Sequence, residues 1–349
     1  MPFDPESAAY WTPVDQYIGG DDHAVMHLIY TRFWAKVMRD IGLVKFDEPV
    51  RRLLTQGMVV GETFFDDETG KRIYFPPDSV DVKRDAKGKI TEAMSKDGKR
   101  LKYGIERMSK SKGNGVDPDE MVDIYGADAT RLFVMFAAPI EHELVWNEAG
   151  IEGAVRFLQR VWRLVYKWKD AFSGDADASS SDVSRALRRK THQTIKRVSD
   201  SLETLQLNTP VAALMELANS IAEIDVEQTD AQDSVKEALT SLVLMLTPFA
   251  PHIAEELFSV LTGSDAGILA SDARFPEYRE ELAKAEEIEI PVQVNGKLRS
   301  RIFAPPDASN DALESMAFAD EKIEEFTSGK EVVKVVVVPG RLVNIVVKG

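Results

Sequence analysis

The stretch Val14-Asp15-Gln16-Tyr17-Ile18-Gly19-Gly20, followed directly by Asp21-Asp22-His23, sets the fold class of the amino-terminal part of the chain. It predicts a strand, a glycine turn and an acidic N-cap of a helix. The run LLTQGMVV at 53–60 predicts a second buried strand. A strand–helix–strand unit indicates a parallel α/β sheet whose ligands bind at the carboxyl ends of the strands. Apolar residues recur at helical spacing between the two strands: Val25, Leu28, Ile29, Phe33 and Val37.

The pattern changes several times further along the chain. Turn signals at 69–70, 87–88 and 97–98 separate short β-like pieces, such as 72–75 and 79–82. A helical pattern begins near 151, with a loop expected at 173–181, and the last segment predicts a helix over 310–326 between two β-hairpins, around 295–296 and 339–340. The expected fold class is multi-domain, α/β plus all-α plus α+β. The expected segments are 1–60 (α/β), 61–106 (a small β-rich insertion), 107–150 (a glycine-punctuated loop with short helices), 151–286 (a helical bundle) and 287–349 (a small α+β domain).

The composition is typical of a soluble protein of two or three domains. The 349 residues include 43 Lys and Arg against 58 Asp and Glu, a net charge of −15, and 44% are hydrophobic. No apolar run approaches the roughly 20 residues of a membrane helix, and no basic-then-apolar leader is present, so we expect a cytoplasmic protein without membrane contact. The chain has no cysteine, which excludes disulfides, thiol nucleophiles and cysteine zinc sites.

The most specific local string is Arg107-Met108-Ser109-Lys110-Ser111-Lys112-Gly113-Asn114-Gly115. Alternating lysines and serines that run into Gly-Asn-Gly can place cationic and hydroxyl donors around a polyanion. Such donors stabilise the charge that develops on a departing pyrophosphate, so phosphate chemistry is our interpretation. The alternative is a solvated Lys/Ser loop, which is the more common meaning of this composition.

The junction of the first strand and helix is a candidate nucleoside site. Gly19 and Gly20 allow a ligand to approach the backbone, and the carboxylate of Asp22 can accept from ribose hydroxyls. An ordinary turn with an aspartate cap is the alternative. His23 and His27 are four residues apart, which predicts one helix face where they line a pocket, bind a metal or serve a structural role. No third ligand accompanies them, so we predict no metal site.

Basic residues cluster in two parts of the helical region, despite the acidic total. Arg156, Arg160, Arg163 and Lys167 follow the spacing of one helix face, and no acid lies between 154 and 169. A second basic face, free of acids over 183–199, contains Arg185, Arg188, Arg189, His192 and Lys196. Two such faces are suited to a nucleic-acid phosphate backbone, and solvated helix faces are the alternative.

These strings together resemble the carboxyl-terminal part of the bacterial-type leucyl-tRNA synthetases, from about Tyr10 to the end. Residues 107–111 are similar to the lysine-rich signature loop of class I synthetases, with Arg107 in place of its first lysine. Residues 14–20 resemble the strand before the adenylate site, where Asp22 stands for a glutamate. The other matching strings are 53–59 (the strand along the adenine), 61–106 (the leucine-specific domain), 125–131 (the junction helix), 246–252 (the end of the tRNA-binding bundle) and 292–297 (the start of the carboxyl-terminal tRNA domain).

The resemblance implies ATP-dependent activation of leucine, with Mg²⁺ bridging the phosphates, and transfer of leucine to tRNA(Leu). It assigns catalysis to Met108, Ser109, Lys110 and Lys112. It assigns ATP and adenylate binding to Gly19, Gly20, Asp22, His23, His27, Gln56, Gly57, Met58 and Lys110. It assigns tRNA binding to Arg156, Arg160, Arg163, Lys167, Arg185, Arg188, Arg189 and Lys196.

Two parts of a whole synthetase are absent from these residues. The sequence contains neither a His-Ile-Gly-His-like element nor a threonine-rich editing pocket. We therefore expect a partial synthetase, which is either a truncated protein or one half of a split enzyme whose amino-terminal half is a separate chain. We expect the isolated chain to be inactive. A non-catalytic tRNA-binding module is the alternative, and an unrelated nucleotide-dependent enzyme with a similar loop is a weaker one.

Overall fold

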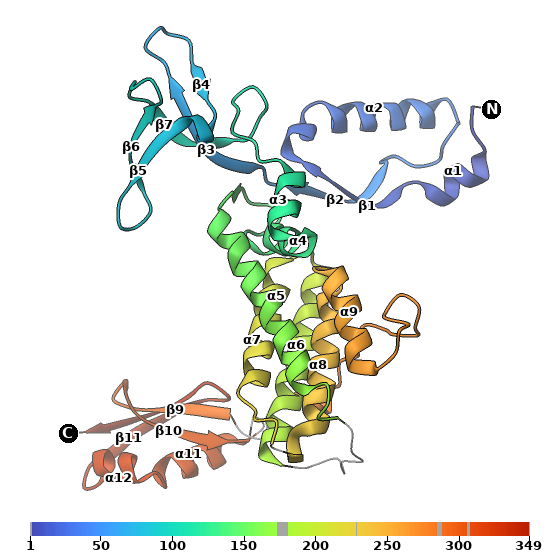
Figure 1. The fold of residues 1–349 in the computed structure, drawn as a ribbon. Helices are drawn as coiled ribbons and strands as arrows, with labels where there is room; N and C mark the ends of the chain where they lie inside the picture. The colour runs from blue at the N-terminus through green and yellow to red at the C-terminus, as the bar shows by residue number, and fades with distance from the viewer. Residues whose placement is uncertain (1, 173–180, 228, 285–287, 306–307, 349) are drawn as a thin grey trace. The chain divides into compact units, whose positions relative to one another are not determined.

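The computed structural model describes residues 2–172, 181–227, 229–284, 288–305 and 308–348 (Figure 1). These residues form two compact units, and each is described by itself. The first comprises residues 1–187 and 194–277, and the second comprises 188–193 and 278–349. Except for Ser181, the loop expected at 173–181 lies outside the described residues.

The first unit begins with the expected parallel strand–helix–strand unit. Helix α1 (Pro5–Trp11) leads into β1 (Val14–Gly20), and helix α2 (His27–Asp40) connects β1 to the parallel strand β2 (Val50–Gln56). The acidic pair does not cap α2, contrary to the sequence prediction. Gly20 instead caps a 3-10 helix, η1 (Asp21–Ala24), and Met26 stands at the N-cap of α2. The chain turns helical directly after Gly20, so both acids lie in the first turn of η1.

The segment where a β-rich insertion was expected contains two small sheets, built mainly of antiparallel pairs. Strand β3 (Val59–Asp66) lies between β4 (Ile73–Phe75) and β7 (Lys102–Arg107), while β5 (Val80–Arg84) pairs with β6 (Ile90–Ser95). A 3-10 helix, η2 (Pro77–Ser79), precedes β5. The short strand β8 (Leu144–Val145) returns from later in the chain to pair with β3 in parallel. Phe64, Val80 and Leu101 belong to the core of this insertion.

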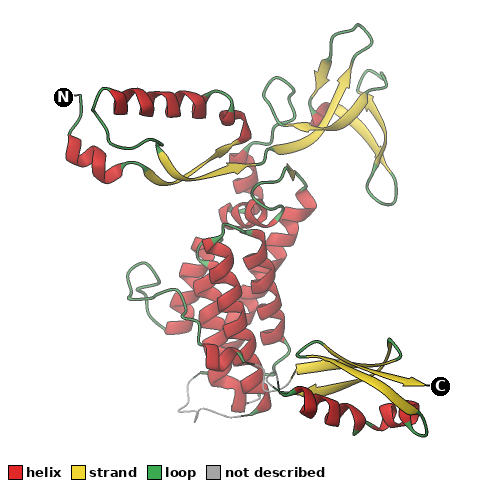
Figure 2. Ribbon diagram, turned by 180° about the vertical axis from the view of Figure 1, so that it is seen from behind, coloured by secondary structure: helices red, strands yellow, loops and turns green. Residues whose placement is uncertain are grey.

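The rest of the first unit is mainly a helical bundle (Figure 2), although residues 188–193 of its helix α6 (Asp182–Glu203) belong to the second unit. Asn147 caps α5, because its Oδ1 accepts from Ala149 N at 3.0 Å. The largest core cluster runs through these helices and includes Phe157, Trp168, Leu214 and Leu239. The elements are α3 (Pro118–Tyr125), α4 (Ala127–Phe136), α5 (Glu148–Trp168), α6 (Asp182–Glu203), α7 (Asn208–Ala222), η3 (Thr229–Ala231), α8 (Gln232–Leu246) and α9 (Pro251–Thr262). None of the helices in the described ranges is long and apolar enough to cross a bilayer.

The second unit contains a four-stranded sheet with its own core. The two expected hairpins are β9 (Ile288–Val294) with β10 (Lys297–Ala304), and β11 (Glu331–Val338) with β12 (Leu342–Lys348). Parallel pairing of β12 with β9 joins them into one sheet in the order β10-β9-β12-β11. The single helix expected over 310–326 is two helices, α11 (Asn310–Phe318) and α12 (Glu321–Thr327), because the Asp320 carboxylate caps a new helix start. A short helix, α10 (Glu280–Ala283), precedes the sheet.

Candidate functional site

The signature loop leaves the end of β7 and is anchored on β3 by one buried side chain. Asn114 is 3% exposed, and its Oδ1 accepts from Ser109 N at 2.9 Å. Its Nδ2 donates to Thr63 Oγ1 at 2.7 Å. Met108 packs against the same strand, where a Cβ added to Gly61 would lie 2.9 Å from Met108 Cε. The loop is therefore held at both ends and projects its middle residues from the sheet.

The two lysines of this loop have different surroundings. Lys112 Nζ pairs with Glu106 Oε2 at 2.8 Å and donates to the carbonyl of Arg107 at 3.3 Å. This contact is the largest cause of the lowered pKa of Glu106. Lys110 is exposed and makes no ion pair or side-chain hydrogen bond with the described part of the chain. Lys110 is thus the loop cation that is available to an anion from outside.

An ion pair joins the loop to the glycine turn, which lies 85 residues earlier. The Arg107 guanidinium donates through both terminal nitrogens to the two carboxylate oxygens of Asp22. Bidentate pairing of this kind fixes orientation as well as charge. The two residues belong to separate motifs in the sequence, and the fold brings them together.

A cavity of about 420 Å³ lies at the carboxyl end of β2. Gln56, Gly57 and Met58 form part of its wall, and Asp21 lies beside them. A Cβ on Gly57 would overlap the backbone carbonyl of His142, so this position accepts only glycine. The cavity therefore gathers residues that the sequence assigned to adenylate binding.

The same wall includes two acids that the sequence analysis missed, Glu141 and Glu143. Their segment enters the site because Leu144 N donates to the carbonyl of Met58 at 3.0 Å. No motif marks the string Glu141-His142-Glu143, so only the pairing of β8 with β3 reveals its position. Asn114 was also missed as an anchor, although its place between two glycines was a signal.

The two histidines lie close together but not on one α-helix. His23 belongs to η1 and His27 begins α2, and their rings meet edge to face at 5.7 Å. The His27 ring also stacks on Tyr17 at 5.8 Å and shares a hydrogen bond with its hydroxyl. Within the described ranges, no three His, Cys, Asp or Glu side chains converge to hold a metal ion.

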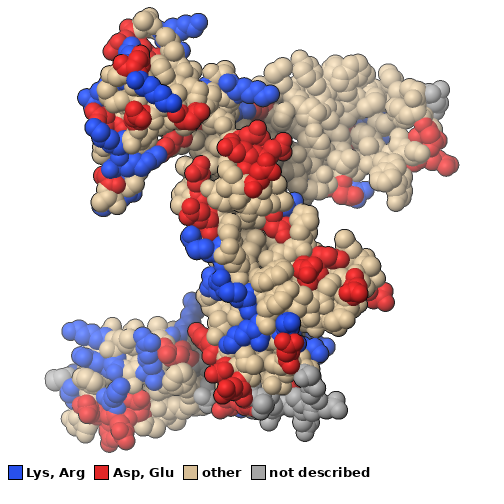
Figure 3. Space-filling model, in the orientation of Figure 1, with Lys and Arg blue, Asp and Glu red and all other residues tan. Residues whose placement is uncertain are grey.

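The basic face of α5 forms as expected from its spacing. Figure 3 shows Lys and Arg side chains gathered along the middle of the bundle. Arg156 pairs with Glu152 at 3.5 Å, Arg160 donates to Asn219, and Lys167 donates to the carbonyl of Ile224 at 3.3 Å. Arg163 is exposed and has no ion pair or hydrogen bond with the described residues.

The basic face of α6 has fewer exposed basic residues than the sequence indicated. His192 is only 3% exposed, and its Nδ1 accepts from Arg279 N at 3.2 Å, so it is not part of an exposed face. Arg185 pairs with Asp182, and Lys196 pairs with Asp200 at 3.0 Å. Arg189 Nε donates to the carbonyl of Lys284 at 3.1 Å, and Arg188 is half-buried. Acids at both ends of the helix thus neutralise part of the face.

Comparisons with known proteins show which proteins this chain is similar to. Residues 100–147 match the family model for tRNA synthetases class I (I, L, M and V), and residues 184–314 match the anticodon-binding domain of tRNA ligase. Leucine–tRNA ligase of Hahella chejuensis is 47% identical over 352 positions, which cover 99% of this chain and 40% of that protein. The Vibrio parahaemolyticus enzyme is 45% identical, with coverages of 98% and 40%.

A solved structure gives the same result. A LeuRS of Agrobacterium radiobacter K84, in a ternary complex with tRNA and LeuAMS, superposes with a TM-score of 0.74 at 30% identity. The match covers 100% of this chain and 39% of that one. The fold and these matches relate the chain to the class I tRNA synthetases. Within that class, the chain is similar over nearly its whole length to leucine–tRNA ligases, and it spans about 40% of the length of these curated relatives.

Proposed function

We propose that this chain provides the pyrophosphate-contacting loop and the tRNA-binding surfaces of a leucine–tRNA ligase. In that reaction, leucine and ATP give leucyl-adenylate and pyrophosphate, and leucine then passes to the terminal ribose of tRNA(Leu). The observation that carries the proposal is the anchored loop at 107–115, in which the Lys110 cation has no ion pair with the described residues. An unpaired cation on a fixed loop is available for the charge that develops on the leaving group.

The residues around the glycine turn suit the nucleoside part of ATP. Gly19 and Gly20 leave the backbone accessible, and Gln56, Gly57 and Met58 bound the cavity at the end of β2. Asp22 is the candidate ribose partner, but its carboxylate is held by Arg107. ATP would therefore have to displace Arg107 or share the carboxylate with it, which couples nucleotide binding to the position of the loop.

The described part of the chain offers donors for phosphates but no cluster of metal ligands for Mg²⁺. Lys110, Ser109 and Lys112 supply ammonium and hydroxyl groups on one loop. No group of metal ligands converges in the described residues, so no step here is assigned to a metal held by this chain. Mg²⁺ would arrive on the triphosphate of ATP.

The finer domain assignment is part of this proposal. Residues 1–60 would be the second half of a Rossmann-type catalytic domain and 61–106 the leucine-specific insertion. Residues 107–150 would be the loop and junction, 151–286 the tRNA-binding bundle and 287–349 the carboxyl-terminal tRNA domain, in a cytoplasmic enzyme. The half-domain assignment is supported by α2, where Ala35 is the buried residue while Ile29, Phe33 and Trp34 are exposed. Parallel sheets are normally covered by helices on both faces. The sheet described here has two strands and one connecting helix, which is less than a complete domain of this type contains.

Binding of a tRNA(Leu) transcript at salt concentrations from 50 to about 200 mM tests the tRNA-binding part. We expect affinity to fall steeply with salt, and Arg163→Gln to reduce the log–log slope by about 0.7 to 0.9, as for one lost phosphate contact. Lys87→Gln, at an exposed turn between β5 and β6, is the matched control and should leave the slope unchanged. Salt-independent binding, or equal effects of the two variants, would contradict the proposed surface.

A further inference from the structure

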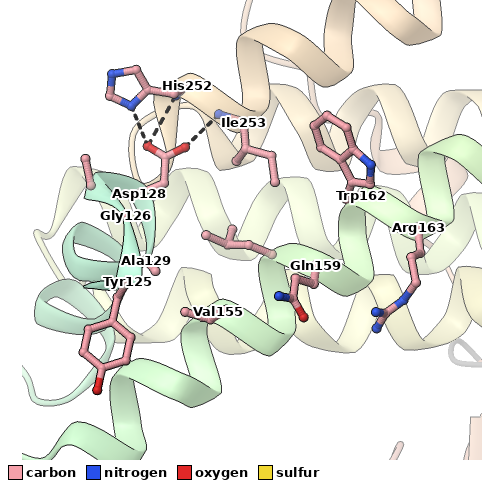
Figure 4. Close-up of a pocket in the computed structure, with 12 residues that line it drawn as sticks. Tyr125, Gly126, Asp128, Ala129, Val155, Gln159, Trp162, Arg163, His252 and Ile253 are labelled. Carbon is pink, nitrogen blue, oxygen red and sulfur yellow. Dashed lines mark hydrogen bonds and ion pairs between the residues drawn. The ribbon is translucent and has the colours of Figure 1, made fainter. Parts of the chain in front are cut away.

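A cavity of about 560 Å³ lies in the first unit, where the start of α4, the middle of α5 and the start of α9 meet. Figure 4 shows Asp128 facing His252 and Ile253 at one end of it, with Trp162 and Arg163 of α5 at the other. Val155 and Ile253 contribute apolar surface between the two ends. The volume is within the range of small-ligand pockets. The α5 wall of the cavity lies outside both matched ranges, 100–147 and 184–314, whereas the walls from α4 and α9 lie inside them.

The acid in the cavity wall is already compensated. Asp128 Oδ2 accepts from Ile253 N at 2.7 Å, while Oδ1 lies 2.9 Å from His252 Nδ1 and 3.3 Å from His252 N. Two of these donors are backbone amides in the first turn of α9, where the helix dipole also favours a negative charge. Asp128 therefore serves the junction of α4 and α9 and adds little repulsion toward an anionic ligand.

The other end of the cavity has aromatic and cationic character. Trp162 lines the cavity and stacks on Tyr166, with ring centroids 4.9 Å apart and planes at 18°. The ammonium of Lys169 lies 5.5 Å from the Tyr166 ring centroid. Arg163, beside this stack, is exposed and without a partner in the described residues. Paired aromatic rings next to an unpaired guanidinium are what RNA-binding surfaces offer to an unstacked base and its phosphate.

The cation row extends beyond the cavity, which favours a polymer over a single small ligand. Arg156, Arg163 and Lys167 lie along α5 with the cavity beside them, and at 1.5 Å per residue the row spans about 16 Å. That length exceeds what one mononucleotide can contact. A polynucleotide can contact several of these residues while one of its bases enters the cavity.

We propose that Trp162, Tyr166 and Arg163 form a binding site for one unpaired nucleotide of tRNA. The base occupies the apolar cavity and extends the Trp162–Tyr166 stack, and its phosphate contacts the Arg163 guanidinium. This inference rests on the proposed tRNA binding and adds a position at which an unpaired nucleotide is held.

Substitutions that remove stacking are the direct test, with binding of a tRNA(Leu) transcript as the readout. Tyr166→Ala and Trp162→Ala should each weaken binding by about 5- to 100-fold without changing its salt slope, since each loses stacking and no charge. Trp162→Phe keeps a ring and should stay within about threefold of wild type. Tyr10→Ala is the matched control, because Tyr10 also contacts a tryptophan, Trp11, far from this cavity in the sequence. If Trp162→Ala fails to fold, Tyr166→Ala carries the test, because Tyr166 is 38% exposed.

Chemical probing of the bound tRNA identifies the nucleotide. We expect one unpaired base to be protected by the wild-type chain and reactive again with Tyr166→Ala. Normal affinity and an unchanged probing pattern with both alanine variants would overturn the site and leave the proposed tRNA binding intact. Absence of any tRNA binding by the wild type would overturn the proposed function itself. Binding of AMP or UMP as tight as that of tRNA would overturn the RNA assignment.

Discussion

At the scale of single residues, Asp22 and Arg107 depart together from the pattern of the family that the chain resembles. The acid is one methylene shorter than a glutamate, and a guanidinium replaces an ammonium. The structure pairs the two side chains, so a shorter acid faces a longer base. Asp22 and Arg107, which both differ from the family pattern, thus contact each other.

Breaking this pair should loosen the signature loop. Arg107→Gln and Asp22→Asn should each increase hydrogen exchange of the amides at 108–113. The cost should not exceed about 1 kcal/mol, because the side chains are 47% and 41% exposed. In a double-mutant cycle, the double variant should behave like either single variant, since both remove the same contact. Additive effects would show that the two residues act independently.

Gly57 is predicted to be the least tolerant position of the cavity wall. Gly57→Ala forces a methyl group onto the His142 carbonyl, and overpacking of this kind costs about 1 to 3 kcal/mol. The free energy of unfolding from denaturant titration measures the loss. Gly104→Ala in β7 is the control, because nothing lies within 4 Å of its added Cβ. Equal stability of the two variants would mean that the backbone at His142 does not pass close to Gly57.

At the scale of elements, ion pairs hold α2 to the segment that precedes β2. Glu48 Oε1 lies 2.7 Å from an Arg32 nitrogen and 3.2 Å from Lys36 Nζ. The hydrogen bond from Arg32, followed by that from Lys36, lowers the pKa of Glu48 from 4.5 to about 2. A carboxylate contact thus supplements the limited apolar packing of this helix.

The stability of α2 should therefore depend on pH in the acid range. The pKa of Glu48 is lower in the folded chain, so its contribution is present above pH 4.5 and is lost as the pH falls toward about 2. Hydrogen exchange of the α2 amides between pH 5 and about 2, corrected for intrinsic rates, measures this loss. Glu48→Gln should flatten the dependence. Glu277→Gln is the control, because Glu277 is exposed and has no ion pair in the described residues, and it should leave the pH dependence unchanged.

At the scale of the whole molecule, we expect the 349 residues to support only part of the activation reaction. The signature loop is present, but the sequence holds no His-Ile-Gly-His-like element. Transition-state stabilisation needs all of its groups in place at once, so the loop alone supplies only part of it.

We therefore expect the purified 349-residue chain to show no leucine-dependent ATP–pyrophosphate exchange. Co-expression with an amino-terminal polypeptide that contains the missing histidine element should restore leucylation, and Lys110→Ala should abolish the restored activity. Ser264→Ala, in a loop after α9, is the control that should retain it. Robust exchange by the chain alone would refute the expectation of a partial synthetase.

Much of the architecture follows from local sequence. The strand at 14–20 and the hairpin at Asn295–Gly296 were predictable, because they depend on neighbours a few residues away. The parallel unit was predictable from the order strand, helix, strand along the chain, although its paired residues, such as Val14 and Val50, are distant in the sequence. At that hairpin, Asn295 and Gly296 have φ values of 51° and 75°, which the sequence pair is known to favour. The signature loop was also visible in the sequence, since its residues are contiguous.

The sequence by itself determined the family pattern, the order of the segments and the candidate loop, because these reside in contiguous residues. Only the tertiary structure decided that Arg107 meets Asp22, that His192 is buried and that Glu141 lines the cavity at Gly57. Only it showed that Trp162 and Asp128 line the same cavity. The physical reason is that burial, charge pairing and cavity walls depend on groups that are distant in the chain. Local propensity and spacing contain no information about those groups.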